Sequence, residues 1–166
     1  DYPLLPKELT EASCGLCHTP SELEGRGGDQ LATGARLFED KGCRGCHQLG
    51  GRGGSNGPAL DNEGLKIKHQ LPMVRVEGPH TVPQWLIEHF RDPQKVVVGS
   101  QMKTPGLNHD EIIALTAFML AQQQRDLPRS YLSPAFHAAL SLKDRPSDLG
   151  GEQLYNRFCG TCHGSG

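Results

Sequence analysis

Three copies of one cysteine–histidine spacing are the residues of this 166-residue chain most suited to chemistry. Each copy has two cysteines three positions apart and a histidine directly after the second, which is the spacing of covalent haem attachment. On one short helical turn, the two sulfurs can reach the two vinyl groups on one edge of a porphyrin, and the histidine can bind the iron. The copies are Cys14, Cys17 and His18; Cys43, Cys46 and His47; and Cys159, Cys162 and His163. The sequence therefore predicts three covalent haem c groups.

Other chemistry for these cysteines fits the spacing less well. A structural zinc site takes four ligands, usually from two spaced pairs, and pairing the first two copies in that way would leave their histidines unexplained. A redox-active dithiol needs a strand followed by a helix, whereas the copies lie among glycine-rich loops. A disulfide framework would not repeat one spacing three times. All six cysteines of the chain fall within the copies.

The composition is that of a loop-rich chain with little apolar material of its own. Hydrophobic residues make up 36% and aromatic residues 5%, and there are 21 glycines and 12 prolines. Bound haem would supply apolar surface around which such a chain can collapse. The formal charge of −2 carries no nucleic-acid signature. No stretch approaches the ~20 apolar residues of a membrane span, and the absence of an initiator Met and a signal peptide predicts a processed or truncated start at Asp1.

Apolar residues at helical spacing predict three helices after the first copy. They cover residues 29–40, 81–91 and 108–124. Asp29, Thr81 and Asn108 are the expected N-caps, and Glu111 lies three residues after Asn108 as in a capping box. Gly34 lies inside the first helix at a cost of ~1 kcal/mol against alanine, which indicates close packing at that position.

The segments between these helices carry weaker patterns. Residues 7–13 are a short polar stretch with little helix, and residues 20–28 are a linker. Residues 50–57 predict a flexible loop, and weak alternation over residues 66–77 predicts a hairpin. After the last helix, residues 133–140 and 150–158 predict short helices, the second of them leading into the third copy.

Residues from about 29 to 124 resemble a class I cytochrome c domain, through several motifs in the family's order. Gly34 and Phe38 precede the middle copy, the loop of Gly57, Pro58, Ala59 and Leu60 follows it, and Trp85, Met102 and Phe118 come later. The resemblance implies a mainly α fold around a covalent haem, with loop-rich haem-binding segments on either side. It also implies that the first and last helices cross tightly, where Gly34 allows the approach and the aromatic side chains pack.

The resemblance implies roles for single residues of the middle haem site. The carbonyl of Pro58 accepts a hydrogen bond from His47 and fixes its orientation, and Met102 is the distal iron ligand. Met73 and Met119 are rivals to Met102, because methionine commonly fills gaps in cores. Trp85 is either close to a haem propionate or a core aromatic.

The outer copies depart from the family's pattern. The first copy has no glycine-plus-aromatic helix before it and no methionine loop of its own, so its haem would borrow a sixth ligand. The spare histidines are His69, His80, His89, His109 and His137; we rank His137 first and His80 second. The third copy resembles the start of another domain, so we expect its haem to be completed by a partner subunit, by a continuation of the chain, or by upstream residues such as His137.

These observations predict a trihaem chain in three parts: a haem-binding segment over residues 1–28, the class I domain over 29–124, and a linker with a further haem-binding segment over 125–166. The expected function is electron transfer between redox proteins, as a subunit of a membrane-bound quinol-oxidising or terminal complex, respiratory or photosynthetic. Covalent attachment in this family implies a periplasmic or equivalent compartment. The competing function is a haem enzyme, such as a dihaem peroxidase with an open iron at haem 1. No signalling segment supports a haem-based sensor.

Overall fold

A computed structural model describes residues 4–123 and 131–135 of the chain. The described part is mainly helical, as predicted, with helices joined by loops and short 3-10 turns. In chain order its elements are η1 (Lys7–Leu16), α1 (Pro20–Leu23), α2 (Asp29–Asp40), η2 (Cys43–Gly45), β1 (Gln48–Leu49), β2 (Arg52–Gly53), η3 (Glu63–Leu65), η4 (Lys68–Gln70), η5 (Met73–Arg75), α3 (Val82–Arg91), α4 (Pro93–Val96) and α5 (His109–Leu120).

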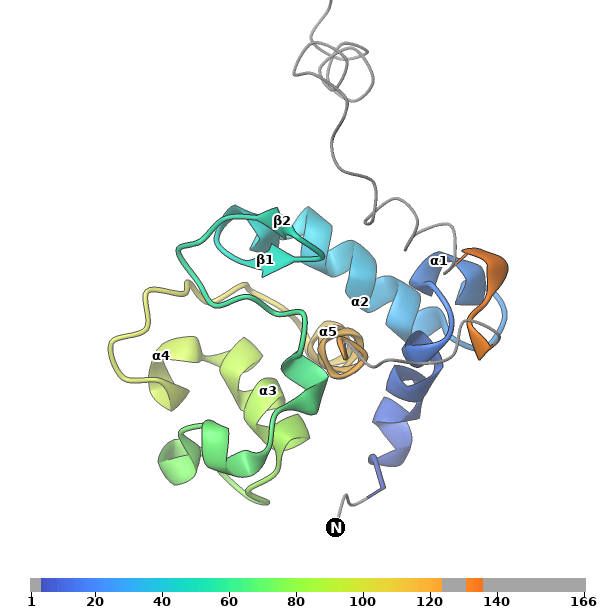
Figure 1. Cartoon of the computed structure of the whole chain (residues 1–166). Helices are drawn as coiled ribbons and strands as arrows, with labels where there is room; N and C mark the ends of the chain where they lie inside the picture. The colour runs from blue at the N-terminus through green and yellow to red at the C-terminus, as the bar shows by residue number, and fades with distance from the viewer. Residues whose placement is uncertain (1–3, 124–130, 136–166) are drawn as a thin grey trace, which may run out of the picture.

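Helices α2 and α5 cross at the centre of the molecule (Figure 1). The predicted close packing at Gly34 is confirmed, because a Cβ atom there would overlap the carbonyl oxygen of Ala114 and lie 2.7 Å from Cβ of Phe118. One turn further along, the rings of Phe38 and Phe118 pack with their centroids 5.7 Å apart at 54°. A tilted aromatic pair beside a glycine contact lets the two backbones approach without leaving a void.

The other elements are arranged around α5. The 3-10 helix η1 packs against α5 from one side, and α3 with α4 lies on the other side (Figure 1). Nine residues of α5 are buried, so this helix is enclosed by the fold rather than amphipathic. Within the described residues, every helix is too short or too polar to cross a membrane.

Two of the three predicted N-caps are confirmed. Thr81 Oγ1 accepts from the Gln84 N–H at 3.3 Å, and Asn108 forms the predicted capping box with Glu111. The third is wrong: α2 begins at Asp29, so Gly28 is its N-cap residue.

The start of α2 is capped from a distant part of the chain. The carboxylate of Glu11, in η1, accepts the N–H of Leu31 at 3.0 Å. A carboxylate at a helix N-terminus satisfies a free donor and complements the helix dipole. Local sequence patterns do not show this contact.

Several predicted segments differ in the structure. Residues 66–77 form the 3-10 turns η4 and η5 rather than a hairpin, because Leu71 and Val76 are drawn into the core with a spacing that alternation does not match. The strand β2 lies instead within the loop predicted to be flexible, and it pairs with β1, which lies just before that loop. Residues 7–16 are helical, although little helix was expected there, because Leu9 and Ala12 bury one face against α5. The linker contains the single turn α1, and α5 ends at Leu120 rather than at residue 124.

We predict that Gly34→Ala destabilises the haem-loaded protein by about 1–3 kcal/mol. The new methyl group meets backbone on α5, which cannot rotate away, and overpacking of that kind outweighs the gain in helix propensity. The free energy of unfolding, measured by chemical denaturation, checks this. Asp40→Ala, on the exposed end of the same helix, is the control and should change stability by about 0.5 kcal/mol or less. Equal stability of the two variants would contradict the helix crossing.

Candidate haem site

The first two cysteine–histidine copies fold into the same backbone turn. In the middle copy, the N–H groups of Cys46 and His47 both donate to the carbonyl of Cys43, at 3.2 and 3.0 Å. In the first copy, the N–H groups of Cys17 and His18 donate to the carbonyl of Cys14 in the same way, at 3.2 and 3.1 Å. The shared turn places two thiols and an imidazole in the same order along the backbone. This is the donor set that covalent haem attachment requires.

The four described cysteines are free thiols. Cys14, Cys17 and Cys43 are half-buried, and Cys46 is exposed. Burial raises the pKa of the Cys43 thiol above its usual value, and the nearby Glu39 and Cys46 raise it further. An unpaired, protonated thiol beside an apolar core is compatible with addition to a vinyl group.

The ring of His47 is held from its outer side by the loop that follows it. Nδ1 of His47 lies 2.9 Å from the carbonyl oxygen of Pro58, so Nδ1–H donates to that carbonyl and Nε2 is left as the acceptor. Gly57 packs directly on the ring, where a Cβ atom would lie 2.7 Å from Nδ1. The loop thus sets the orientation of the ring and leaves Nε2 for a metal.

Arg44, between the two cysteines of the middle copy, ties the turn to its surroundings. Its Nη1 donates to the carbonyl of Leu49 at 2.7 Å, and its Nε lies 2.7 Å from the carboxylate of Glu39. Its guanidinium also lies over the Phe38 ring, 5.4 Å from the centroid. The turn is therefore linked to the end of α2 and to β1.

A second group of functional side chains comes from α3 and from the loop after α4. Nε2 of His89 lies 3.2 Å from the sulfur of Met102, and the His89 ring stacks on Trp85 with centroids 4.5 Å apart at 11°. A thioether sulfur carries no hydrogen, so Nε2 of His89 must be the donor and Met102 the acceptor. Nδ1 of His89 and Nε1 of Trp85 are buried and have no hydrogen-bond partner among the described residues.

The electrostatics of His89 link this group to the middle copy. Burial, together with the nearby charges of His47 and Lys66, lowers the pKa of His89 to about 4. His89 is therefore neutral at neutral pH, and its single ring proton lies on Nε2, from which it is donated to the sulfur.

The three methionines are now distinguished by position. Met119 is 2% exposed in the core of α5, as predicted for a packing residue. Met73 lines a separate pocket with His69 and His80. Of the three, Met102 is the one whose sulfur accepts a hydrogen bond from His89.

The first copy is fixed by the same two helices as the middle copy. A Cβ atom at Gly15 would lie 2.7 Å from Cβ of Ala121 and 3.2 Å from the Leu31 side chain, so this turn packs at the start of α2 and the end of α5. The middle copy follows the opposite end of α2. The length of α2, about 18 Å from its 1.5 Å rise per residue, thus sets the separation of the two turns.

Glu22 organises the surroundings of His18. Its carboxylate accepts from the N–H of Thr19 at 2.7 Å and from the hydroxyl of Ser133 at 2.7 Å, and lies 4.0 Å from Nδ1 of His18. The hydrogen bond from the Thr19 N–H has the largest effect in lowering the pKa of Glu22, and the hydrogen bond from the Ser133 hydroxyl has the next largest. The N–H of Ser133 also donates to the carbonyl of Cys17 at 3.0 Å. The chain after α5 therefore returns to the first copy.

The structure does not bring every predicted residue to these sites. His80 lines a cleft with Leu4, Leu5 and Pro6, at the start of η1, whereas Cys14 and His18 lie at its far end. His109 is exposed at the start of α5, and His69 lies beside His80. Cys159, Cys162, His163 and His137 lie outside the described residues.

Sequence reasoning missed the roles of His89 and Glu22. His89 was one of five spare histidines, and nothing local distinguishes it, because its partner Met102 lies 13 positions away. The sequence did carry one signal for His89. It lies four positions after Trp85, and residues at that spacing share one face of a helix. Glu22 carried a capping-box signal with Thr19, but its contact with Ser133 spans 111 positions.

The comparisons with known proteins agree with this geometry. The family model described as cytochrome c matches residues 31–123, which is more than half of the chain. Cytochrome c oxidase subunit 2 of Alkalihalophilus pseudofirmus is 27% identical over 120 residues, covering 72% of this chain and 33% of that protein. The chain thus spans about one third of that relative's length. No solved structure matches the chain.

The matched range contains the middle copy, the Pro58 loop, the His89–Met102 contact and the crossing of α2 with α5. These parts include the cysteines and the histidine that covalent haem attachment requires. The chain therefore belongs to the cytochrome c family, whose domain carries covalently bound haem c and transfers electrons.

Proposed function

We propose that the chain is a trihaem electron-transfer segment that passes electrons between redox proteins. The observation that carries this proposal is the identical turn of the first two copies, built at opposite ends of α2. When bound, haem c supplies an iron that changes oxidation state by one electron. Two such groups at the ends of one short helix would lie close enough for electrons to pass between them.

The roles at the middle site follow from the contacts around it. Cys43 and Cys46 form the thioether bonds, His47 is the proximal ligand and Met102 the distal ligand. Pro58 holds His47 through its carbonyl. With His47 and Met102 both holding the iron, the site would exchange electrons without binding substrate.

Two residues of α3 complete the middle site. The buried N–H of Trp85 has no partner among the described residues, which supports its donation to a haem propionate. His89 positions Met102 by donating to its sulfur.

At the first site, Cys14 and Cys17 form the thioethers and His18 is the proximal ligand. We rank His137 first as sixth ligand, because Ser133, four positions earlier, is bound to both Cys17 and Glu22. Four residues of extended chain reach up to about 14 Å. His80 is the second candidate and has less support, since it lies at the other end of η1.

The third site uses Cys159 and Cys162 for the thioethers and His163 as proximal ligand. We propose that a partner subunit or a continuation of the chain covers this haem, because a bare face would expose a large apolar patch.

An enzyme with an open iron at haem 1 is the second candidate, and the acidic residues near the first copy argue against it. A peroxidase-like reaction needs a free acid–base group beside the iron. Glu11 caps α2, Glu24 pairs with Arg36, and Glu22 accepts from Thr19 and Ser133. None of these three carboxylates is free to shuttle protons, which supports an electron carrier.

The similarity to a cytochrome c oxidase subunit 2 supports a proposal about the complex in which this chain transfers electrons. Because that relative is a cytochrome c oxidase subunit 2, we propose that the chain serves a membrane-bound respiratory complex, quinol-oxidising or terminal, on the periplasmic or equivalent side. Within the chain, we propose the division into residues 1–28, 29–124 and 125–166. The first segment shares the core of the second, since Leu9 and Ala12 are buried with it.

The haem count tests the proposal. We expect three haems per chain by intact mass and by pyridine haemochrome assay, and two in the double variant Cys159→Ala/Cys162→Ala. Carbon monoxide added to the reduced protein should leave its spectrum almost unchanged if every iron has two protein ligands. One haem per chain, or bound zinc, would refute the trihaem assignment. A large carbon monoxide response that persists in the double variant would favour the enzyme.

Met102→Ala tests the distal ligand. The absorption band of ferric methionine-ligated haem should vanish and the reduction potential should fall, because thioether ligation favours ferrous iron. Met73→Leu is the matched control, since its side chain lines another pocket, and it should keep both properties. A band that survives in Met102→Ala would assign the ligand elsewhere.

His89→Phe tests the positioning role. Phenylalanine keeps the stack on Trp85 but removes the donor, so more electron density stays on the sulfur and ferric iron is favoured. With a hydrogen bond worth about 0.5–1.5 kcal/mol and about 59 mV per tenfold change for one electron, the potential should fall by some tens of millivolts while the methionine band remains. An unchanged potential would leave His89 a packing residue only. His109→Ala is the control.

A further inference from the structure

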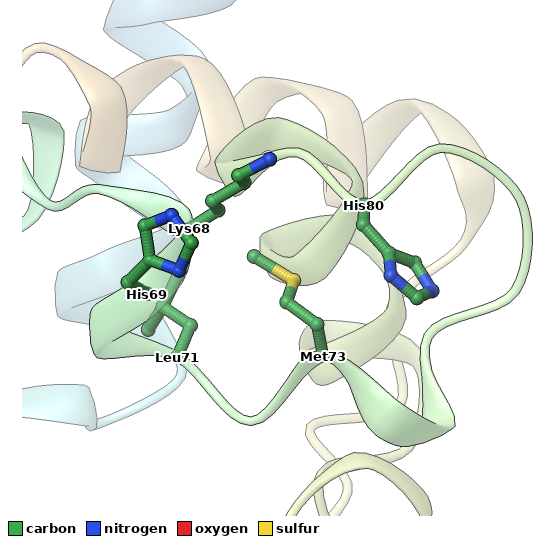
Figure 2. Close-up of a pocket in the computed structure, with 5 residues that line it drawn as sticks. All are labelled: Lys68, His69, Leu71, Met73 and His80. Atoms are coloured by element: carbon green, nitrogen blue, oxygen red, sulfur yellow. The ribbon is translucent and has the colours of Figure 1, made fainter.

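Two histidines and a methionine that the haem sites do not use line one pocket. His69, Met73 and His80 surround a space of about 360 Å³ together with Lys68 and Leu71 (Figure 2). They come from three successive parts of the segment between the middle copy and α3: His69 from η4, Met73 from η5, and His80 from the loop before α3. In Figure 2 the thioether of Met73 lies between the side chains of the two histidines.

The backbone that carries these side chains is anchored in the core. Leu71 and Val76, on either side of Met73, are 9% and 6% exposed. The N–H of Leu71 donates to the carbonyl of Lys68 at 3.3 Å, and the N–H of Val76 donates to the carbonyl of Met73 at 3.0 Å. Buried anchors and closed turns hold the three side chains over one space. Little conformational freedom of the backbone would therefore be lost when a ligand binds there.

The three side chains are available as ligands. Within the described residues, neither imidazole takes part in a hydrogen bond or an ion pair, and both histidines are exposed. Met73 is half-buried at the pocket, unlike Met119 in the core and Met102 against His89. Met73 packs in part against the hydrophobic core, and its thioether also lies between the two imidazoles (Figure 2).

We propose that His69, Met73 and His80 form a binding site for a soft monovalent metal ion, copper(I). Thioether and imidazole are ligands that suit copper(I). No carboxylate lines the pocket, which disfavours calcium and magnesium because they take oxygen ligands. Three neutral ligands beside the charge of Lys68 also favour a single positive charge over a divalent ion. The site is independent of the haem assignments, apart from the use of His80, our second-ranked ligand for haem 1.

The test is an anaerobic titration of the haem-loaded protein, with its haem iron reduced beforehand, with copper(I) in competition with a chromophoric copper(I) chelator. In that form the cysteine thiols, which would compete strongly for copper(I), are consumed in the bonds to haem. We expect one copper(I) per chain, with no change in the haem spectrum. Met73→Leu keeps the volume of the side chain and removes the sulfur, and should weaken binding by about tenfold or more, the scale on which metal sites respond to a lost partner. The double variant His69→Ala/His80→Ala should abolish it.

His109→Ala, at an exposed histidine outside the pocket, is the matched control and should bind copper(I) as the parent does. Absence of retained copper would overturn the proposal, as would equal affinity in Met73→Leu and the control. A haem spectrum that shifts on copper addition, equally in the parent and in Met73→Leu, would place the ion at an iron ligand and also overturn it. An altered haem spectrum in the copper-free His80→Ala protein would instead assign His80 to haem 1.

Discussion

The contact between Gly34 of α2 and the backbone of α5 at Ala114 is the constraint on which the rest of the structure depends. It brings two helix backbones closer than any side chain would allow, and Phe38 with Phe118 fills the space beside it. Because the middle copy begins three residues after α2 ends, the angle of α2 on α5 decides where Cys43 and its thiol lie.

The same helix pair also places the first copy. Gly15 packs against Leu31 at the start of α2 and Ala121 just after α5. Glu11 from the same segment caps α2 at Leu31. A change in the crossing would therefore move both copies, which makes the N-terminal segment part of one packed unit with the domain that follows it.

Much of the domain could be predicted from the sequence, because its signals are local. The three main helices, the caps at Thr81 and Asn108, and the close packing at Gly34 follow from spacing and residue type. The loop after the middle copy could not be predicted as well. Glycine allows both mobility and close approach, and only the structure shows that Gly57 lies against His47 and donates its N–H to the carbonyl of Cys46.

Three of the contacts that were not predicted join residues far apart in the sequence. Glu11 reaches Leu31 across 20 positions, Ser133 reaches Glu22 across 111, and His89 reaches Met102 across 13. Each contact joins a common polar or sulfur-containing residue to one partner, although several other residues of the chain could have served as that partner. Residue type therefore limits the candidates, and only tertiary structure selects among them.

The pairing of His89 with Met102 shows how such a contact bears on function. An electron carrier works best when its metal ligands keep one geometry in both oxidation states, because every rearrangement adds to the barrier for transfer. His89 is fixed by its stack on Trp85, and its neutral ring can donate from Nε2 to the sulfur without accepting a proton. Met102 is thus held by a group on a rigid helix, although it lies on a loop. His47 is held in the same way by Pro58. In the proposed haem site, the two side chains that would hold the iron are each restrained by a second residue, which would keep them in place rather than release one for substrate. This arrangement favours electron transfer over catalysis at the middle site.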